Sequence, residues 1–394
     1  MAAEHDKKIL YVHTGVWPSP SPSIVFVTGT AYGFSQTMRT VLFVKNGSDD
    51  PTEEVFRSLT GYDPPEKLDI VRAGLGAKTP GHAAFYRQAL GRVKAMAKEG
   101  ELAAVITRSV GFLPYLVYCR KRYGIPCFFE THDFFTDLSM RTDLKKNVRI
   151  RKNSLYERKC IPRLDGLICL TNPQKELYRK SYPESPIHVA HTGLLHVERR
   201  DTRREKLVCY IGSLDEHKGL GTILTALGQT VDKEAGLLVI GGKNEHEMRK
   251  FKDFARLMGI ENRVRVTGWV HHSDIGHMMD RCIAGVVPLA DTPFNRYITS
   301  PLKILDCFSR SLPVIGSDLP SIRDYVEDGG HGLLFQPDSP ESLSETLDRY
   351  IACGMFETMS PKVEQHAMDF LYSRRGESII AFIDGIIQNR QERK

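Results

Sequence analysis

The sequence predicts an α/β protein with two domains, each built on a parallel sheet with helices on its faces. Three observations lead to this fold class. The 394 residues exceed the roughly 100–200 of a typical domain. Short continuous apolar runs alternate with longer helical patterns, and a charged stretch without apolar periodicity, residues 196–206, separates two such series. Apolar runs suit strands that are buried on both faces, and alternating strands and helices give parallel sheets with right-handed crossovers.

Each series supplies strands and helices in turn. In the first we expect strands at 8–13, 40–44, 68–72, 102–107 and 126–130, with helices at 21–36, 51–60, 82–99 and 111–123. In the second we expect strands at 207–212, 236–241, 263–267, 283–287 and 312–316, with helices at 218–232, 244–258, 273–281, 301–309, 319–327 and 340–353.

These elements define the expected domains, a first at 1–200 and a second at 201–365. The apolar residues of 361–392 recur at helical spacing. A closing helix within 366–394 is therefore expected, returning to the first domain. In open parallel sheets a nucleotide-type ligand binds at the carboxyl ends of the strands, here in the cleft that the two domains are expected to face.

Composition excludes several classes of protein. Apolar residues make up 41% and charged residues 26%, as in globular chains, and no apolar run approaches the roughly 20 residues that cross a bilayer. The eight cysteines are scattered without CxxC spacing, mostly in apolar company. This predicts reduced, buried thiols in a cytoplasmic protein, and no zinc site.

The net charge of +6 hides an asymmetry between the two halves. Residues 1–200 hold 30 Lys/Arg and 20 Asp/Glu, a charge of +10, whereas residues 201–394 hold 24 and 28, a charge of −4. Halves of opposite sign are expected to meet different partners.

Residues 139–163 concentrate the positive charge, with nine Lys/Arg and two acids. A partial apolar stripe accompanies them, made of Leu144, Val148, Ile150, Leu155 and Ile161. Such a stretch suits an anionic acceptor or the anionic inner face of a membrane, and a solvated helix face is the other interpretation. The cations that would make the contact are Lys145, Lys146, Arg149, Arg151 and Lys152. Nucleic acid is not expected, because no recognition motif accompanies the charge.

Two segments of the second half are suited to phosphate. Gly212-Ser-Leu-Asp-Glu-His-Lys218-Gly219 follows a strand and opens a helix, so backbone N–H groups and Lys218 could meet an anion, with Ser213 in the same loop. Ser300-Pro-Leu-Lys-Ile-Leu-Asp306 predicts a helix capped by Ser300, with Lys303 in its first turn and Asp306 placed for ribose hydroxyls. An ordinary βα loop and a capped helix with an exposed acid are the alternatives.

A third constellation lies in the first half, where Phe128-Phe-Glu-Thr-His-Asp133 runs from a strand into polar residues. His132 is placed there to bond a sugar or to move a proton. A structural histidine bonded to a loop carbonyl is the alternative.

Together these residues resemble a retaining glycosyltransferase of the GT-B fold, in glycosyltransferase family 4 (glycosyl transferases group 1). The resemblance is strongest over 207–345. It is weaker over the first half, where it includes 17–25 after the first strand and 165–171, which would open the last strand. It rests on Tyr210-Ile-Gly-Ser-Leu-Asp-Glu-His-Lys-Gly219, Val239-Ile-Gly-Gly242, Val266-Thr-Gly-Trp-Val270, Val286-Val-Pro-Leu289, Ser300-Pro-Leu-Lys-Ile-Leu-Asp306 and residues 312–323, in that order.

The resemblance implies a role for each site residue. Lys218 and Ser213 would meet the donor diphosphate, whose distal phosphate would be held after Ser300 by the amides of Leu302 and Lys303. Asp306 would take the ribose hydroxyls, Trp269 and Val270 would flank the base, and His132 would contact the donor sugar or the acceptor. Such enzymes need no metal, because lysine and helix dipoles neutralise the leaving diphosphate.

Three departures from the family pattern stand out. Ser213 occupies the usual place of an arginine, the usual pair of glutamates is replaced by Ile298 and Asp306, and a Pro/Ser run at 18–23 replaces a Gly-Gly pair. All three bear on the identity of the donor sugar.

We therefore expect transfer, with retention, of a hexose-type sugar from a nucleoside diphosphate to a lipid-linked or polysaccharide acceptor. Two alternatives stay open. A GT-B sugar-nucleotide epimerase would use Glu130 or Asp133 as acid or base, and a degenerate subunit would bind a nucleotide sugar without turnover. The sequence leaves the choice of UDP or GDP and the oligomeric state open.

Overall fold

The structure is a computed structural model that describes residues 7–19, 21–74, 79–140, 148–200, 202–214, 218–242 and 244–392. It divides into two compact units, Met1–Leu195 with Leu371–Lys394, and His196–Phe370. The unit boundaries thus lie at Leu195/His196 and Phe370/Leu371, where the sequence suggested residues 200 and 365. Each unit is described separately.

The first unit contains a seven-stranded sheet of order β3-β2-β1-β4-β5-β6-β7, in which all neighbours pair in parallel. Its strands are β1 (Lys8–Trp17), β2 (Thr40–Asn46), β3 (Leu68–Ala73), β4 (Leu102–Thr107), β5 (Cys127–Glu130), β6 (Gly166–Cys169) and β7 (Ile187–Val189). The strand order reverses between β1 and β4, which makes this pair the topological switch point of the sheet.

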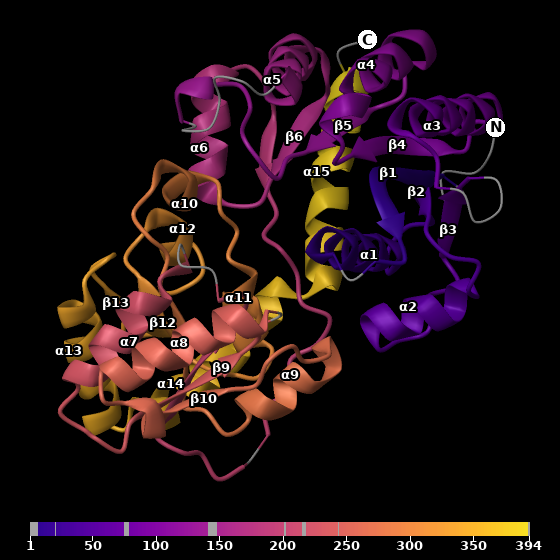
Figure 1. Ribbon diagram of the computed structural model, residues 1–394. Coiled ribbons are helices and arrows are strands. Elements are labelled where there is room, and N and C mark those ends of the chain that lie inside the picture. The colour runs from indigo at the N-terminus through magenta and orange to yellow at the C-terminus, as the bar shows by residue number, and fades with distance from the viewer. Residues whose placement is uncertain are drawn as a thin grey trace. The chain divides into compact units, whose positions relative to one another are not determined.

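The helices of the first unit are α1 (Pro22–Ser35), α2 (Thr52–Thr60), α3 (His82–Lys98), α4 (Leu113–Tyr123), α5 (Val148–Cys160), α6 (Asn172–Ser181) and α15 (Tyr372–Glu392). Although α1 and α15 come from opposite ends of the chain, they pack side by side (Figure 1). Two glycines permit this approach. A Cβ at Gly33 would lie 1.9 Å from the Tyr372 carbonyl oxygen, and one at Gly376 would lie 2.3 Å from the Gly33 carbonyl group. The C-terminal helix is therefore part of the first unit.

The second unit contains a six-stranded parallel sheet of order β10-β9-β8-β11-β12-β13. Its strands are β8 (Leu207–Ile211), β9 (Gly236–Ile240), β10 (Val264–Val266), β11 (Ala284–Val287), β12 (Val314–Ser317) and β13 (Gly332–Phe335). Its helices are α7 (Leu220–Gln229), α8 (Glu245–Leu257), α9 (His272–Met279), α10 (Pro293–Tyr297), α11 (Leu302–Phe308), α12 (Pro320–Arg323), α13 (Pro340–Ala352) and α14 (Met355–Ala367). The switch point lies between β8 and β11.

The predicted α/β class with two parallel sheets is confirmed, with local differences. The sequence did not predict β7, β13, α6 or α10, whose apolar runs or helical repeats are too short to stand out. The helix expected at 319–327 ends at Arg323. The residues of 361–392, whose apolar positions recur at helical spacing, are divided between α14 and α15, and Leu371, between the two helices, pairs with Leu194.

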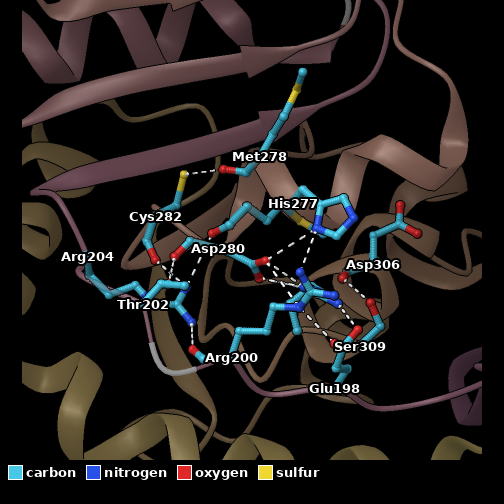
Figure 2. A network of polar contacts seen from close by, with 12 residues as sticks. Glu198, Arg200, Thr202, Arg204, His277, Met278, Asp280, Cys282, Asp306 and Ser309 are labelled. Carbon is cyan, nitrogen blue, oxygen red and sulfur yellow. Dashed lines mark hydrogen bonds and ion pairs between the residues drawn. The ribbon is translucent and has the colours of Figure 1, made fainter.

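The charged stretch 196–206, predicted as a linker, is anchored on the second unit (Figure 2). Arg310 is 4% exposed, and its guanidinium Nη2 donates to both carboxylate oxygens of buried Asp280 at 2.6 and 2.8 Å. The same guanidinium binds Glu198, and Arg204 donates to the Cys282 carbonyl at 2.9 Å. These bonds explain why the unit boundary lies before this stretch.

All eight cysteines are free thiols, seven of them buried, as the sequence predicted. Among the described helices, none combines the length and apolar character that a membrane-spanning segment requires.

Candidate functional site

The carboxyl edge of the second sheet brings together the loops that follow β8, β9 and β11. A Cβ at Gly241 would lie 2.1 Å from the Gly212 carbonyl oxygen, and one at Gly219 would lie 2.1 Å from the Pro288 carbonyl oxygen. All three glycines have positive φ, at 140° for Gly212, 74° for Gly219 and 141° for Gly241. Only glycine suits such positions, so direct backbone contacts shape this edge at the β8/β11 switch point.

Lys303 connects the two segments that the sequence singled out for phosphate. Its Nζ donates to the Tyr210 hydroxyl at 2.8 Å and lies 4.0 Å from the centre of that ring. The Tyr210 hydroxyl in turn donates to the Ser213 carbonyl oxygen at 3.0 Å. A Cβ at Gly212 would lie 3.0 Å from both Cε and Nζ of Lys303. The loop after β8 and the start of α11 therefore form one corner that contains an ammonium group.

Ser300 does not cap α11, which corrects the prediction from the sequence. The helix begins at Leu302 with Pro301 at the N-cap, and no side chain caps it. The Ser300 hydroxyl instead lies 2.8 Å from the Tyr325 hydroxyl, in a hydrogen bond. The first-turn amides of a helix have no carbonyl partner within the helix. The N–H groups of Leu302 and Lys303 are therefore suited to donate hydrogen bonds to an anion.

Lys218 lies directly before Gly219, the N-cap of α7, and its side chain is exposed. Ser213 is exposed on the other side of the loop, and residues 215–217 between them lie outside the described part of the chain. The described part of this loop thus offers one solvent-accessible cation, Lys218.

The residues predicted to hold the nucleoside lie on two elements. Trp269 follows β10 with 64% of its surface exposed, and Val270 beside it is half-buried. Such an exposed indole offers a flat apolar surface to a base. Asp306 lies on α11, half-buried, and its carboxylate points away from the Asp280 cluster in Figure 2. In the described part of the chain, no three His, Cys, Asp or Glu side chains gather as a metal site would require.

His132 lies in the first unit, in the loop after β5, with an exposed side chain. Partial desolvation of the ring, together with the positive charges of Arg108 and Arg149, lowers the pKa of His132 below its ordinary value. The imidazole is therefore neutral at physiological pH, able to donate one hydrogen bond and to accept another.

A buried carboxyl group fixes the loop that carries His132. Glu157, on α5, accepts hydrogen bonds from the Phe135 amide and the Thr136 hydroxyl, each at 2.9 Å, and lies 3.0 Å from the Tyr178 hydroxyl. Burial raises the pKa of Glu157 to about 7. Glu157 could not be predicted from the sequence, because a lone acid in a basic stretch carries no signal of its position.

The basic stretch forms α5, but its apolar residues do not make one stripe. Val148 and Leu155 are exposed, at 80% and 48%, whereas Ile150 and Ile161 are buried. The exposed face also carries three of the predicted contact cations, Arg149, Arg151 and Lys152. Lys145, Lys146 and Leu144 lie outside the described residues.

Two family models match the chain. The model described as "Glycosyltransferase Family 4" matches residues 39–194, and "Glycosyl transferases group 1" matches residues 205–352. Among curated relatives, an alpha-D-kanosaminyltransferase of Streptomyces kanamyceticus is 22% identical over 62% of this chain. The chain spans less than two thirds of the length of the curated relatives that it matches, 36% of one and 65% of the other.

Solved structures share the fold over nearly the whole chain. A sucrose-phosphate synthase from Thermosynechococcus elongatus has a TM-score of 0.71 at 16% identity, covering 97% of this chain and 100% of that one. HepE of Anabaena, in complex with UDP and glucose, has a TM-score of 0.66 at 16% identity and covers 96% of this chain and 100% of its own. The chain therefore has the GT-B fold that the sequence predicted.

Proposed function

This chain belongs to glycosyltransferase family 4, and on that premise we propose that it transfers a hexose-type sugar from a nucleoside diphosphate to an acceptor. The observation that carries this proposal is the corner in which Lys303 meets Tyr210 and the loop of Gly212 and Ser213. Its ammonium group, the exposed Lys218 and the amides of Leu302 and Lys303 are suited to a diphosphate. HepE of Anabaena, which shares the fold, binds UDP and glucose.

The remaining donor contacts follow from the same premise. Asp306 takes the ribose hydroxyls, and Trp269 and Val270 flank the base. The cations and the helix ends offset the charge of the leaving diphosphate without a metal. Excess EDTA should therefore leave turnover unchanged, and a complete loss restored by Mg²⁺ would contradict this part of the proposal.

We assign His132 to the donor sugar or the acceptor near the reacting centre, with retention of the anomeric configuration. A neutral imidazole suits this place, because it can accept a hydrogen bond from a sugar hydroxyl. Proton NMR of the first product formed distinguishes retention from inversion directly.

Release of nucleoside diphosphate from a panel of UDP- and GDP-sugars tests the central proposal. Lys218→Ala removes one charged contact with the diphosphate and should reduce turnover about tenfold to a hundredfold, equivalent to about 1.5–3 kcal/mol. Lys252→Ala, which removes an exposed lysine of α8, is the matched control. Equal turnover in the two variants would count against the assignment of Lys218.

A second candidate function has its own observation. Ile298, at the place of the first glutamate of the family, is buried with 2% of its surface exposed, so no carboxylate of that position serves a donor sugar. This favours a subunit that binds a nucleotide sugar without turnover. Calorimetric binding of UDP or GDP, with no release of diphosphate from any donor, would identify this second function.

The acceptor is assigned to the basic first unit, on a lipid-linked or polysaccharide substrate at the cytoplasmic face of a membrane. The exposed face of α5 supports peripheral association, since it combines Arg149, Arg151 and Lys152 with exposed Val148 and Leu155. Flotation with anionic liposomes should succeed at low salt and fade at high salt. Absence of flotation at low salt would refute membrane association.

A further inference from the structure

The first unit contains a buried arginine that has no hydrogen-bond partner for most of its guanidinium. Arg108 directly follows β4 and is 7% exposed. Neither its Nε nor its Nη1 has a hydrogen-bond partner within the described residues. The guanidinium lies 3.7 Å from the centre of the Phe26 ring, which supports it on one side. Such a group is costly to bury, because a guanidinium always carries its charge.

The nearby carboxylate does not pair with Arg108. Glu130 is 1% exposed, and its two oxygens accept hydrogen bonds from the Tyr11 hydroxyl and from Arg375. Arg375 also lies over the Phe26 ring, at 4.9 Å. The cluster therefore contains two guanidinium groups and one carboxylate, and the carboxylate pairs with Arg375, which leaves the charge of Arg108 without an ion-pair partner among the described residues.

The histidines of the same region add no compensating charge. Burial, helped by the charge of Arg108, lowers the pKa of His13 to about 3, so His13 is neutral, as is His132. His13 Nε2 lies 3.0 Å from the Ser23 hydroxyl at the start of α1. His13 Nδ1 is buried and has no partner among the described residues. The unsatisfied polar atoms of this cluster are thus the Nε and Nη1 of Arg108 and the Nδ1 of a neutral histidine, and none of them bonds to a carboxylate among the described residues.

The position of this cluster in the sheet is that of a ligand site. His13 lies on β1 and Arg108 follows β4, the two strands between which the order of the first sheet reverses. Ligands of open parallel sheets bind outside the carboxyl ends of the strands at this point. Thr14 and Ser109 fix the two strand ends to each other, since the Thr14 amide donates to the Ser109 hydroxyl at 3.0 Å.

We propose that Arg108 binds an oxyanion of the acceptor, a phosphate or a carboxylate, at the β1/β4 switch point of the first unit. This rests on the proposed function in one respect, that the molecule carrying the oxyanion is the sugar acceptor. A planar guanidinium suits either anion, because two of its N–H groups can bind two oxygens at once. The oxyanion would supply the charge and the hydrogen-bond acceptors that the cluster lacks.

The test observes the NMR resonance of the Arg108 Nε–H group. This resonance is assigned as the one that is missing from the spectrum of Arg108→Met. UDP is added first to fill the donor site, and inorganic phosphate or acetate is then titrated, with sodium chloride at matched ionic strength as the control. We expect a saturable shift of this resonance with phosphate, with acetate, or with both. The arm that saturates identifies the class of oxyanion. A resonance that moves with neither, or equally with chloride, would overturn the proposal.

Thermal unfolding gives a second readout that does not depend on turnover. Arg108→Met removes a buried unpaired charge, so it should raise the melting temperature without added anion and abolish the further rise that phosphate or acetate gives the parent protein. Arg87→Met, at an exposed arginine of α3, should retain that anion-dependent rise. An anion-dependent rise that is equal in both variants would contradict the proposal. Failure of UDP to bind would refute the donor site alone, because the resonance of Arg108 reports the oxyanion independently.

Discussion

Glu157 makes the stability of the protein depend on pH in a direction opposite to that of most carboxylates. Burial raises its pKa to about 7 in the folded protein, against about 4.3 for an unperturbed glutamate. Below both values the group is protonated in the folded and the unfolded chain. Between them the unfolded chain ionises first, so stability falls as the pH rises from about 4 to about 7.

The size of this effect follows from the shift in pKa. Each unit corresponds to about 1.4 kcal/mol, so ionising Glu157 should remove about 3–4 kcal/mol from the free energy of unfolding above pH 7. Glu157→Gln has no such group, while its amide oxygen can still accept from the Phe135 amide and the Thr136 hydroxyl. The difference in stability between the parent and this variant should therefore change by about 3 kcal/mol across that range.

Urea unfolding of both proteins between pH 4.5 and 8 measures this difference, since the other titrating groups cancel in the comparison. Glu176→Gln, at an exposed acid of α6, is the matched control and should show a difference that is independent of pH. A flat difference for Glu157→Gln would refute the account of how the His132 loop is held. A difference that shifts in favour of the parent as the pH rises would do so as well.

Three further predictions concern the donor corner and the packing of each unit. Lys303→Ala should weaken UDP or GDP binding about tenfold or more in calorimetry. Tyr210→Phe keeps the ring under the ammonium group and should cost less than half of that binding free energy. An equal loss in the two variants would show that the ring does not support Lys303. Gly33→Ala should destabilise the protein by about 3 kcal/mol in thermal or urea unfolding, because the new Cβ would lie 1.9 Å from the Tyr372 carbonyl oxygen. Gly91→Ala is the control and should be neutral or stabilising, because nothing lies within 4 Å of a Cβ there. Arg310→Met should cost about 3 kcal/mol of unfolding free energy by leaving Asp280 buried beside weaker partners, and Arg374→Met, at an exposed ion pair, should change stability by less than about 0.5 kcal/mol.

The periodicity of the sequence was enough to predict most of the fold. Residues 102–107 form β4 with the expected bounds, and 207–212 and 236–241 differ from β8 and β9 by one residue at the end. A strand that is buried on both faces consists of consecutive apolar residues, which can be recognised in the sequence. The edge strand β7, which is only half-buried, leaves no such run.

The individual residues of the donor site could be predicted from the sequence, but the contacts between them could not. Lys218, Ser213 and Lys303 were singled out because they follow strands or open helices, which is local information. The contact of Lys303 with Tyr210 depends on how α11 lies against β8, and no spacing in the sequence encodes it. The capping role of Ser300 was predicted from local preference and is wrong, because Tyr325, twenty-five positions further along, takes its hydroxyl.

Arg108 shows the same limit in the first unit. An arginine after an apolar strand is ordinary in a sequence, and its meaning depends on which acid pairs with it. Glu130 is close to Arg108 in the fold, but its carboxylate accepts a hydrogen bond from Arg375 of the C-terminal helix instead. The unpaired charge of Arg108 thus depends on a second arginine far away in the chain.

Hydrogen–deuterium exchange with and without saturating UDP or GDP tests the donor site most directly. We expect slower exchange at the backbone amides that follow β8, around Gly212 and Gly219, and at the start of α11, around Lys303, with little change in Lys303→Ala. Slower exchange confined to other parts of the chain, or none with either nucleotide, would contradict the assignment of a nucleoside-diphosphate donor to this corner.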